Sequence, residues 1–353
     1  MEYRQLGRSG LLVSSLAFGT ATFGGVGALG KWGATDVEEA KRLLDACLDA
    51  GVNLIDTADA YSRGRSEEIL GAAIKGRRER LLVATKVRFR MGEGPNDHGL
   101  SRSHIVAGCE ASLKRLGVDH IDLYQAHQWD GLTPVEETLE AFDTLVRSGK
   151  VRYWGVSNFA GWQIVKTAAA AAAGGFVPPV SQQIYYSLES RDAEYELIPA
   201  GIDQGLGTLV WSPLAGGLLS GKYRRGKAPE EGGRHLNDWH EPPLSDEDRL
   251  YDTIEVLVEI AGGRGASAAE VALAWLLGRP SIASVILGAR TEAQLARNLG
   301  AAELRLTAEE RARLDKVSLP RLLYPHWHQA RAIADRLGPG EASLLRGHLD
   351  EEA

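Results

Sequence analysis

The chain has 353 residues, of which 44% are hydrophobic, 25% charged and 7% aromatic, which excludes collagen-like, mucin-like and disordered proteins. Its formal net charge of -7 disfavours general nucleic-acid binding, because an acidic surface repels a phosphate backbone. No apolar run approaches the roughly 20 residues of a membrane span, and the N-terminus lacks the apolar core of a signal peptide.

The two cysteines, Cys47 and Cys109, lie outside any CxxC or Cys/His pattern. We therefore expect neither a disulfide framework nor a metal site. Together with the acidic charge, this predicts a cytoplasmic protein that binds a small molecule rather than a nucleic acid or a membrane. The sequence leaves the oligomeric state open.

Short apolar or β-branched runs alternate along the chain with longer segments of helical spacing. Strict alternation predicts a parallel sheet covered by helices, and eight repeats favour a closed (β/α)8 TIM barrel over an open doubly wound sheet. The candidate strands are Val13–Gly19, Asn53–Thr57, Leu81–Lys86, Ile121–His127, Val151–Ser157, Val180–Tyr185, Thr208–Trp211 and Ser284–Leu287.

Residues that favour helix ends frame the segments between these strands. Asp36 and Ser101 are expected N-caps, Ser66 is expected to open a helix, and Thr133 is expected to cap one whose first turn contains a proline. The predicted helices cover residues 37–50, 66–76, 101–116, 133–149 and 163–173.

Three parts of the chain fall outside this rhythm. Residues 3–6 and 11–13 predict a small N-terminal β-hairpin that plugs the bottom of the barrel. Residues 224–245, rich in Gly, Pro, Glu and His, predict a long mobile loop. We expect residues 1–353 to form one barrel domain, with the barrel over about residues 13–302 and extra C-terminal helices and loops over about residues 303–353.

The ends of three successive strands carry groups capable of proton chemistry, where a barrel places its active site. The predicted strands end at or near Asp56, Lys86 and His127, and Tyr61 follows shortly after Asp56. A lysine ammonium lowers the pKa of a neighbouring phenol, and a carboxylate keeps that lysine charged. With His127 directing a substrate oxygen, Tyr61 would protonate an alkoxide, which carbonyl reduction by hydride requires.

Each of these four residues has a structural alternative when taken alone. A strand-end aspartate beside a lysine often forms an ion pair, a loop tyrosine usually packs, and a lone histidine more often satisfies a hydrogen bond than catalyses a reaction. Their coincidence on one predicted rim favours a catalytic site.

Several long motifs resemble those of the aldo-keto reductases. They are GVNLIDTADAY at residues 51–61, Thr85-Lys86, DLYQAH at 122–127, GVSNF at 155–159 and WSPLAGGLLSGKY at 211–223. The resemblance covers about residues 3–317. It implies that Asp56, Tyr61, Lys86 and His127 are a catalytic tetrad with Tyr61 as the general acid/base.

The resemblance also implies a bound nicotinamide dinucleotide. The residues that it assigns to the carboxamide, the ring, the pyrophosphate and the adenosine end are Ser157, Asn158, Gln183, Trp211, Ser212, Leu214, Gly216, Lys222, Gly288, Arg290, Gln294 and Asn298. Arg290 at the start of a predicted helix suits a 2′-phosphate, so NADPH (NADP+) is favoured and NADH is the alternative. Arg297 stands where the family commonly has an acidic residue.

Residues 25–30 form a literal GxGxxG sequence shortly after the first predicted strand. In a dinucleotide-binding Rossmann unit the helix opens within that motif. Here residues 31–35 intervene before Asp36, so these glycines predict a flexible rim loop.

Aromatic residues supply the candidate walls of a substrate pocket, which suits an aldehyde or ketone. They are Trp32 and Trp129, with Phe23, Tyr324 and Trp327 as further candidates. The leading hypothesis is an NADPH-dependent reductase of aldehydes or ketones. The alternatives are an NAD(P)-linked sugar or alcohol dehydrogenase, and a redox-sensing, cofactor-binding regulatory subunit similar to channel β subunits.

Overall fold

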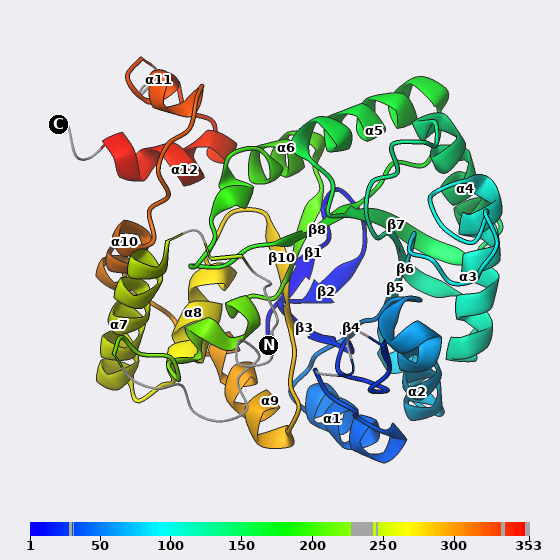
Figure 1. Cartoon of the computed structure of the whole chain (residues 1–353), viewed down its shortest axis with the longest axis horizontal. Helices are drawn as coiled ribbons and strands as arrows, with labels where there is room; N and C mark the ends of the chain where they lie inside the picture. The colour runs from blue at the N-terminus through cyan, green and yellow to red at the C-terminus, as the bar shows by residue number, and fades with distance from the viewer. Residues whose placement is uncertain (28–29, 31, 227–242, 245, 333–335, 350–353) are drawn as a thin grey trace.

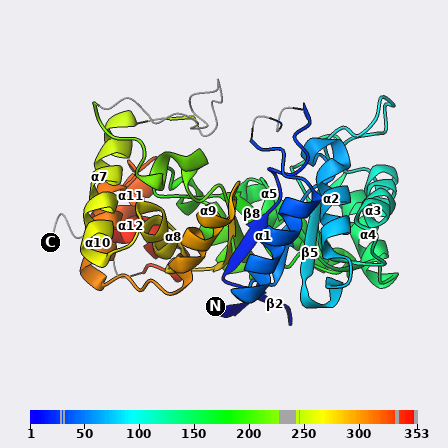
Figure 2. The same cartoon turned by 90° about the horizontal axis from the view of Figure 1, so that it is seen from below.

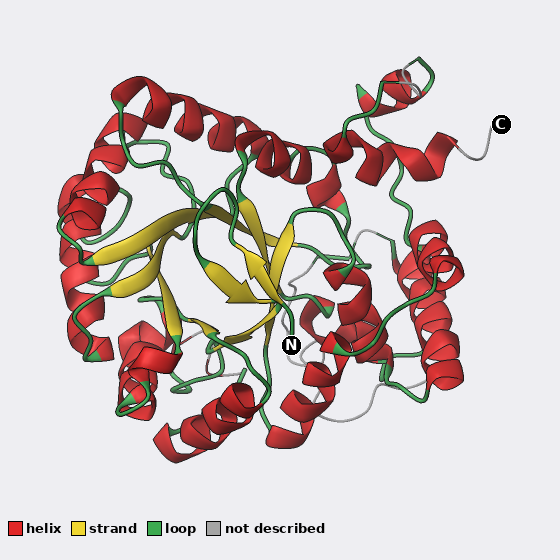
Figure 3. Ribbon diagram, turned by 180° about the vertical axis from the view of Figure 1, so that it is seen from behind, coloured by secondary structure: helices red, strands yellow, loops and turns green. Residues whose placement is uncertain are grey.

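Eight parallel strands close into a barrel in the order β10-β3-β4-β5-β6-β7-β8-β9, and helices surround them (Figure 1, Figure 3). The computed structural model describes residues 1–27, 30, 32–226, 243–244, 246–332 and 336–349. The barrel strands are β3 (Leu16–Gly19), β4 (Leu54–Asp56), β5 (Leu82–Val87), β6 (Ile121–Ala126), β7 (Val151–Ser157), β8 (Ser181–Tyr185), β9 (Gly207–Trp211) and β10 (Ile282–Leu287). The predicted (β/α)8 barrel is confirmed.

The helices around the barrel follow the strands in chain order. They are α1 (Val37–Asp49), α2 (Arg65–Ile74), α3 (Arg102–Leu116), α4 (Val135–Arg147), α5 (Gly161–Gly174), α6 (Leu197–Gln204), α7 (Glu247–Arg264), α8 (Ala268–Leu277) and α9 (Glu292–Leu299). Asp36 and Ser101 cap α1 and α3 as predicted, because each side chain accepts a hydrogen bond from a first-turn backbone N–H.

The starts of α2 and α4 differ from the prediction. Pro134 occupies the N-cap position of α4, while the Thr133 hydroxyl donates to Asp130 Oδ2 at 2.7 Å instead of capping the helix. Helix α2 begins at Arg65 after a left-handed Gly64, so Ser66 lies inside the helix. The Thr133 hydroxyl thus bonds within its own loop, and the Ser66 hydroxyl makes a tertiary hydrogen bond to the Thr20 carbonyl, so neither caps the helix terminus.

Alternate residues of the strands divide between two apolar clusters, one inside the barrel and one between strands and helices. Leu54 and Ala84 belong to the inner cluster, whereas Ile55 and Val83 pack in the outer one. A residue two positions beyond an inward residue also points inward. The inward-facing positions therefore continue to the C-terminal ends of the strands, where polar residues such as Asp56 and Lys86 occupy them.

The N-terminal hairpin pairs β1 (Tyr3–Gln5) with β2 (Leu12–Ser14) in antiparallel fashion. Leu6 and Val13 are fully buried and join the inner cluster, so the predicted plug is confirmed (Figure 2). The predicted first strand, residues 13–19, therefore divides between β2 and β3. Gly7 has a φ of 60° and lies against the backbone at the start of β8 and β9, so closely that a Cβ would lie 2.4 Å from Val180 O.

The C-terminal segment forms α10 (Ala308–Val317), α11 (His326–Ala330) and α12 (Pro339–Leu349), as the predicted extra helices. Helix α10 packs on α7, and α12 packs on α6, outside the barrel (Figure 1). Most of the predicted 224–245 loop, residues 227–242 and 245, lies outside the described residues. Over the described part of the chain, none of the helices combines the length and apolar character that crossing a membrane would need.

We predict that Leu6→Ala lowers the free energy of unfolding by about 2–5 kcal/mol, because it leaves a cavity in the inner cluster under the barrel. Chemical denaturation measures this change. Leu132→Ala is the matched control, since the Leu132 side chain is 96% exposed and its loss removes little buried area. Equal effects of the two substitutions would contradict a plug that contributes to stability.

Candidate active site

Asp56, Tyr61 and Lys86 meet at the C-terminal end of the barrel. The Lys86 side chain is fully buried, and its ammonium donates to Asp56 Oδ1 at 2.6 Å, to the Thr57 carbonyl at 2.8 Å and to Tyr61 OH at 3.4 Å. An ammonium has three protons, so these three acceptors account for all of its hydrogen bonds. The predicted contact between the phenol and the ammonium is present.

Tyr61 begins a short turn, Tyr61–Gly64, whose backbone is left-handed at three successive residues. The φ angles are 48° at Ser62, 56° at Arg63 and 87° at Gly64. Non-glycine residues adopt this region only when their surroundings hold them there. The Ser62 hydroxyl donates to the carbonyl of Phe23 at 2.7 Å and supplies one such contact.

The pKa of Tyr61 differs in direction from the sequence-based expectation. Burial raises this pKa above the usual value for tyrosine, and the charge of Lys86 opposes the rise only in part. The pKa of Lys86 is also raised, because the attraction of Asp56 and Tyr61 outweighs the effect of burial. The sequence-based expectation of a lowered Tyr61 pKa left out the desolvation of the phenol. At neutral pH the phenol is therefore protonated and lies beside a charged lysine.

His127 follows β6, with its ring centroid 5.9 Å from that of Tyr61 and 4.7 Å from that of Phe89. Burial, followed by the positive charges of Lys86 and Arg88, holds the pKa of His127 well below its usual value. The imidazole is therefore neutral at physiological pH and retains one N–H for donation to a substrate oxygen.

A cavity of about 610 Å³ opens beside Asp56, Tyr61 and His127. Trp32, one of the expected pocket walls, lines this cavity. Phe89 and Gln128 line it as well, although the sequence reasoning did not select them. Each follows the end of its strand by two residues, so extending the strand-end rule slightly downstream would have found both.

Trp129 does not line this cavity, so its prediction as a pocket wall is wrong. The ring packs against Phe159 and Trp162, with centroids 5.2 and 5.6 Å away, and borders a separate small cavity. Strand β6 ends at Ala126, so the period that points side chains inward stops before Trp129 is reached.

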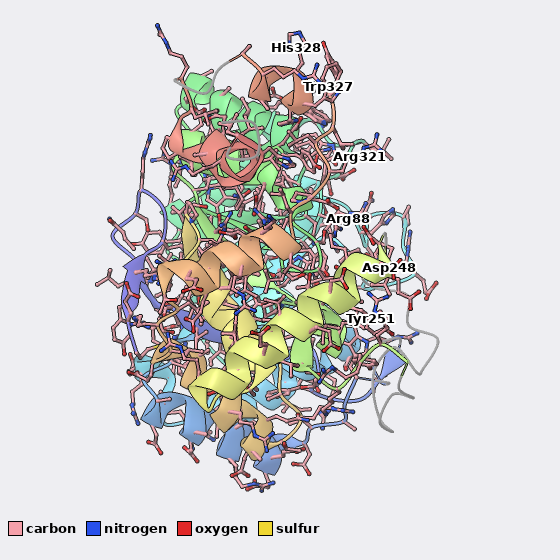
Figure 4. All side chains as sticks on the ribbon, turned by 90° about the vertical axis from the view of Figure 1, so that its left-hand side faces the viewer. Arg88, Asp248, Tyr251, Arg321, Trp327 and His328 are labelled. Atoms are coloured by element: carbon pink, nitrogen blue, oxygen red, sulfur yellow. The ribbon has the colours of Figure 1, made fainter. Side chains whose placement is uncertain are left out.

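The other aromatic candidates also lie away from the cavity lining. Phe23 is buried in the outer cluster against Phe18. Tyr324 and Trp327 contact each other on the C-terminal segment, and Figure 4 shows Trp327 well separated from Arg88, which follows β5.

A second groove continues from this cavity across the ends of β9 and β10. Both are lined by Thr22, Ser212, Pro213, Leu287 and Gly288. Of the residues predicted to bind the cofactor, the first cavity also contains Asn158, Gln183 and Trp211, and the groove also contains Leu214, Gly216, Lys222, Arg290, Gln294 and Asn298. Ser157 is buried at the end of β7, with a hydroxyl that has no hydrogen-bond partner among the described residues.

The groove suits a dinucleotide in shape and in charge. Nothing lies within 4 Å of the position that a Cβ would take on Gly217 or Gly288, so a ligand can approach the backbone there. Lys222, Arg290 and Arg297 supply positive charge along the groove. Arg297, which departs from the family pattern, therefore adds to the cationic end of the groove.

Hydrogen bonds connect the cavity residues Asn158, Gln183 and Trp211 with Asp56 and His127. Gln183 Nε2 donates to Asp56 Oδ2 at 2.8 Å, and Trp211 Nε1 donates to Asn158 Oδ1 at 3.0 Å. Asn158 Nδ2 in turn donates to the His127 carbonyl at 3.0 Å. The side chains predicted to hold the nicotinamide are thus fixed by the residues predicted to perform the chemistry.

The GxGxxG glycines lie in the loop between β3 and α1, and Ala28 and Leu29 within it fall outside the described residues. The sheet is a closed barrel rather than an open doubly wound sheet. As the sequence indicated, this motif is no Rossmann fingerprint.

The family model described as the aldo/keto reductase family matches residues 15–319. The chain belongs to this family. Membership gives this chain a general oxidoreductase role. Aldo/keto reductases in general use NADH or NADPH.

Curated relatives of this aldo/keto reductase carry two kinds of name. An uncharacterized oxidoreductase of Bacillus subtilis (strain 168) is 43% identical over 88% of this chain and 93% of its own length. A probable voltage-gated potassium channel subunit beta of Oryza sativa subsp. japonica is 42% identical over 86% and 92%, respectively. Its counterpart of the same name from Arabidopsis thaliana is 40% identical over 86% and 92%.

We predict that His127 makes the protein lose stability as the pH falls. The folded protein resists protonation of His127, while the unfolded chain takes up that proton near pH 6.5, so this contribution is present above that pH and lost below it. Between pH 7 and pH 5, wild type should lose about 1–2 kcal/mol more unfolding free energy than His127→Gln. Denaturation at each pH measures the slope, with His98→Gln at an exposed histidine as control. Parallel curves for wild type and His127→Gln would contradict the assignment.

Proposed function

We propose that this aldo/keto reductase reduces an aldehyde or ketone to an alcohol with NADPH, and that Tyr61 is the general acid. The observation that carries the proposal is the Lys86 ammonium, which contacts both Asp56 and Tyr61 OH beside a cavity that His127 also lines. No other arrangement in the described cavity places a proton donor and a neutral imidazole on the same open space.

The residues divide the work of proton transfer among them. The substrate carbonyl oxygen lies between Tyr61 OH and His127, which donates a hydrogen bond that fixes its direction. A nicotinamide cofactor held by Asn158, Gln183 and Trp211 would supply the hydride. Tyr61 gives its proton to the developing alkoxide, and Lys86 stabilises the phenolate that remains. Asp56 keeps that lysine charged throughout.

The raised pKa of Tyr61 fits the direction of reduction. A phenol that stays protonated through neutral pH is ready to donate, whereas alcohol oxidation needs the phenolate at the start. An NAD(P)-linked sugar or alcohol dehydrogenase would use the same site in reverse, and it is favoured only at alkaline pH.

The cationic end of the groove supports NADPH over NADH. Arg290 precedes α9, whose first turn is capped by Thr291, and Arg297 projects from the same helix into the groove lining. Guanidinium groups bind a phosphate through paired hydrogen bonds, and a helix N-terminus adds backbone donors.

A redox-sensing regulatory subunit is the second candidate function. The rice and Arabidopsis relatives named as potassium channel subunits beta match this chain over 92% of their own lengths, which favours it. Such a subunit would hold the same cofactor in the same groove. Tight NADPH binding without consumption of NADPH by any aldehyde or ketone tested would favour this candidate over the reductase.

We predict that Tyr61→Phe lowers kcat for carbonyl reduction by at least about 100-fold, because the proton donor is lost. The Kd for NADPH, measured by fluorescence titration, should change by less than about twofold, since the tyrosine does not line the pyrophosphate groove. Tyr251→Phe on α7 is the matched control and should retain turnover. Near-normal turnover in Tyr61→Phe would overturn the mechanism.

We predict that Arg290→Ala reduces the preference for NADPH over NADH by about 10- to 100-fold, the value of a charge-assisted phosphate contact. The loss should appear in KM for NADPH, with the constants for NADH nearly unchanged. Arg102→Ala, at an exposed arginine of α3, controls for the loss of one positive charge. An unaltered preference would remove the argument for 2′-phosphate recognition by Arg290.

A further inference from the structure

Two buried residues at the start of α2, Ser66 and Glu67, contact the C-terminal ends of β3, β4 and β5. Strands β4 and β5 carry Asp56 and Lys86. The Ser66 hydroxyl lies 2.8 Å from Thr20 Oγ1 and 3.0 Å from Thr57 Oγ1, and it also donates to the Thr20 carbonyl. The Glu67 carboxylate accepts from Thr85 Oγ1 at 2.5 Å. Both residues have no solvent exposure. We call Ser66, Glu67 and these three threonines the threonine clamp.

The threonines of the clamp are direct neighbours of the site residues. Thr57 follows Asp56, and Thr85 precedes Lys86. Because strand side chains alternate between faces, Lys86 points to the inside of the barrel while Thr85 points outward to α2. A single helix turn outside the barrel therefore fixes the strand ends from which Asp56 and Lys86 project.

The same helix turn also supports the segment that carries Tyr61. Glu67 Oε2 accepts from Arg115 Nε of α3 at 2.6 Å. The Arg115 side chain packs beneath Gly64, where a Cβ would lie only 2.8 Å from Arg115 Cδ. Gly64 ends the left-handed turn that begins at Tyr61, so Glu67 connects this turn with the strand that carries Lys86.

We propose that Ser66 and Glu67 are positioning residues that set the distance between Tyr61 OH and Lys86 Nζ. The inference rests on the proposed function of Tyr61 and goes beyond it. At 3.4 Å this contact is the longest that the ammonium makes, so a small displacement of either side breaks it. A displacement of about 1 Å at a reacting group costs on the order of 100-fold in rate.

The chemistry of the clamp favours positioning over simple packing. A buried ion pair such as Glu67–Arg115 adds little stability compared with apolar side chains of the same volume. Its directional hydrogen bonds, however, fix relative positions that an apolar contact would leave adjustable. Ser66 and Glu67 are polar residues in a fully buried place. What their hydrogen bonds provide there is a fixed relative position of the strands and the helix rather than added stability.

The test compares two Thr→Val substitutions, each of which removes the hydroxyl of a different buried threonine. Thr85→Val deletes the hydrogen bond to Glu67, and Thr253→Val deletes a bond from a fully buried threonine of α7 to its own helix. Thr85→Val should lower kcat by about 10- to 100-fold with KM and the Kd for NADPH within about twofold. Thr253→Val should leave kcat within about twofold, at a comparable loss in Tm. Equal kcat values in the two variants would overturn the proposal.

Ser66→Ala provides a second variant, which cuts the clamp at β3 and β4 instead of β5. It should show the same fall in kcat at constant KM. In a Tyr61→Phe background, neither clamp variant should lower the residual rate further, since positioning acts through the phenol. A further fall in that background would show that the clamp acts otherwise and would also overturn the proposal.

A measurement on the cofactor-free protein separates this inference from the proposed function. The titratable groups that act on the pKa of Tyr61 are Lys86, Asp56 and Asp59, and of these three Lys86 alone lowers it. Ultraviolet titration of tyrosinate, with the signal of the matching Tyr61→Phe protein subtracted, should place the Tyr61 transition at higher pH in Thr85→Val than in wild type. If wild type reduces no carbonyl, the proposed function fails while this titration still decides the positioning role; an unshifted transition would reject it.

Discussion

The buried ammonium of Lys86 is the constraint on which the site depends. A cation without solvent exposure is costly unless acceptors surround it, and the barrel provides a carboxylate, a carbonyl and a phenol within hydrogen-bond distance. The second oxygen of Asp56 accepts from Gln183, which lines the same cavity and is proposed to hold the nicotinamide carboxamide. The residues that compensate this one charge thereby connect Tyr61, the proposed general acid, with the proposed cofactor site.

Three ionisable groups near this pair, Tyr61, His127 and Asp59, are neutral at physiological pH. Burial raises the pKa of Tyr61 and lowers that of His127, so both carry no charge. Burial and the neighbouring Glu67 raise the pKa of Asp59 to about 8, so its carboxyl is protonated too. Beside the Lys86–Asp56 ion pair, these three uncharged groups are the ones able to donate a hydrogen bond or a proton.

Sequence predicted those parts of the site that follow from strand period and strand order. Asp56 and Lys86 could be placed on one rim because each ends an apolar strand, and parallel strands end on the same side. The position of Trp129 could not be predicted in this way, because the prediction would need the end of β6, which lies at Ala126. The protonation of Tyr61 was equally out of reach, because desolvation depends on everything that packs around a group rather than on its neighbour in a motif.

The start of α2 shows how local and tertiary demands on the same residues diverge. Ser66 and Glu67 have the sequence of a helix opening, yet their side chains contact β3, β4 and β5 instead of the helix terminus. The first turn of α2 does without a side-chain cap, and the preceding turn is left-handed at Ser62 and Arg63, a conformation that costs on the order of 1–3 kcal/mol per residue. A sequence optimised for stability alone would have a cap there and a relaxed turn. The fold instead keeps the strained turn beside Tyr61, so that the phenol is held where the Lys86 ammonium can reach it. The two apolar clusters, inside the barrel and between strands and helices, offset the cost of this strain.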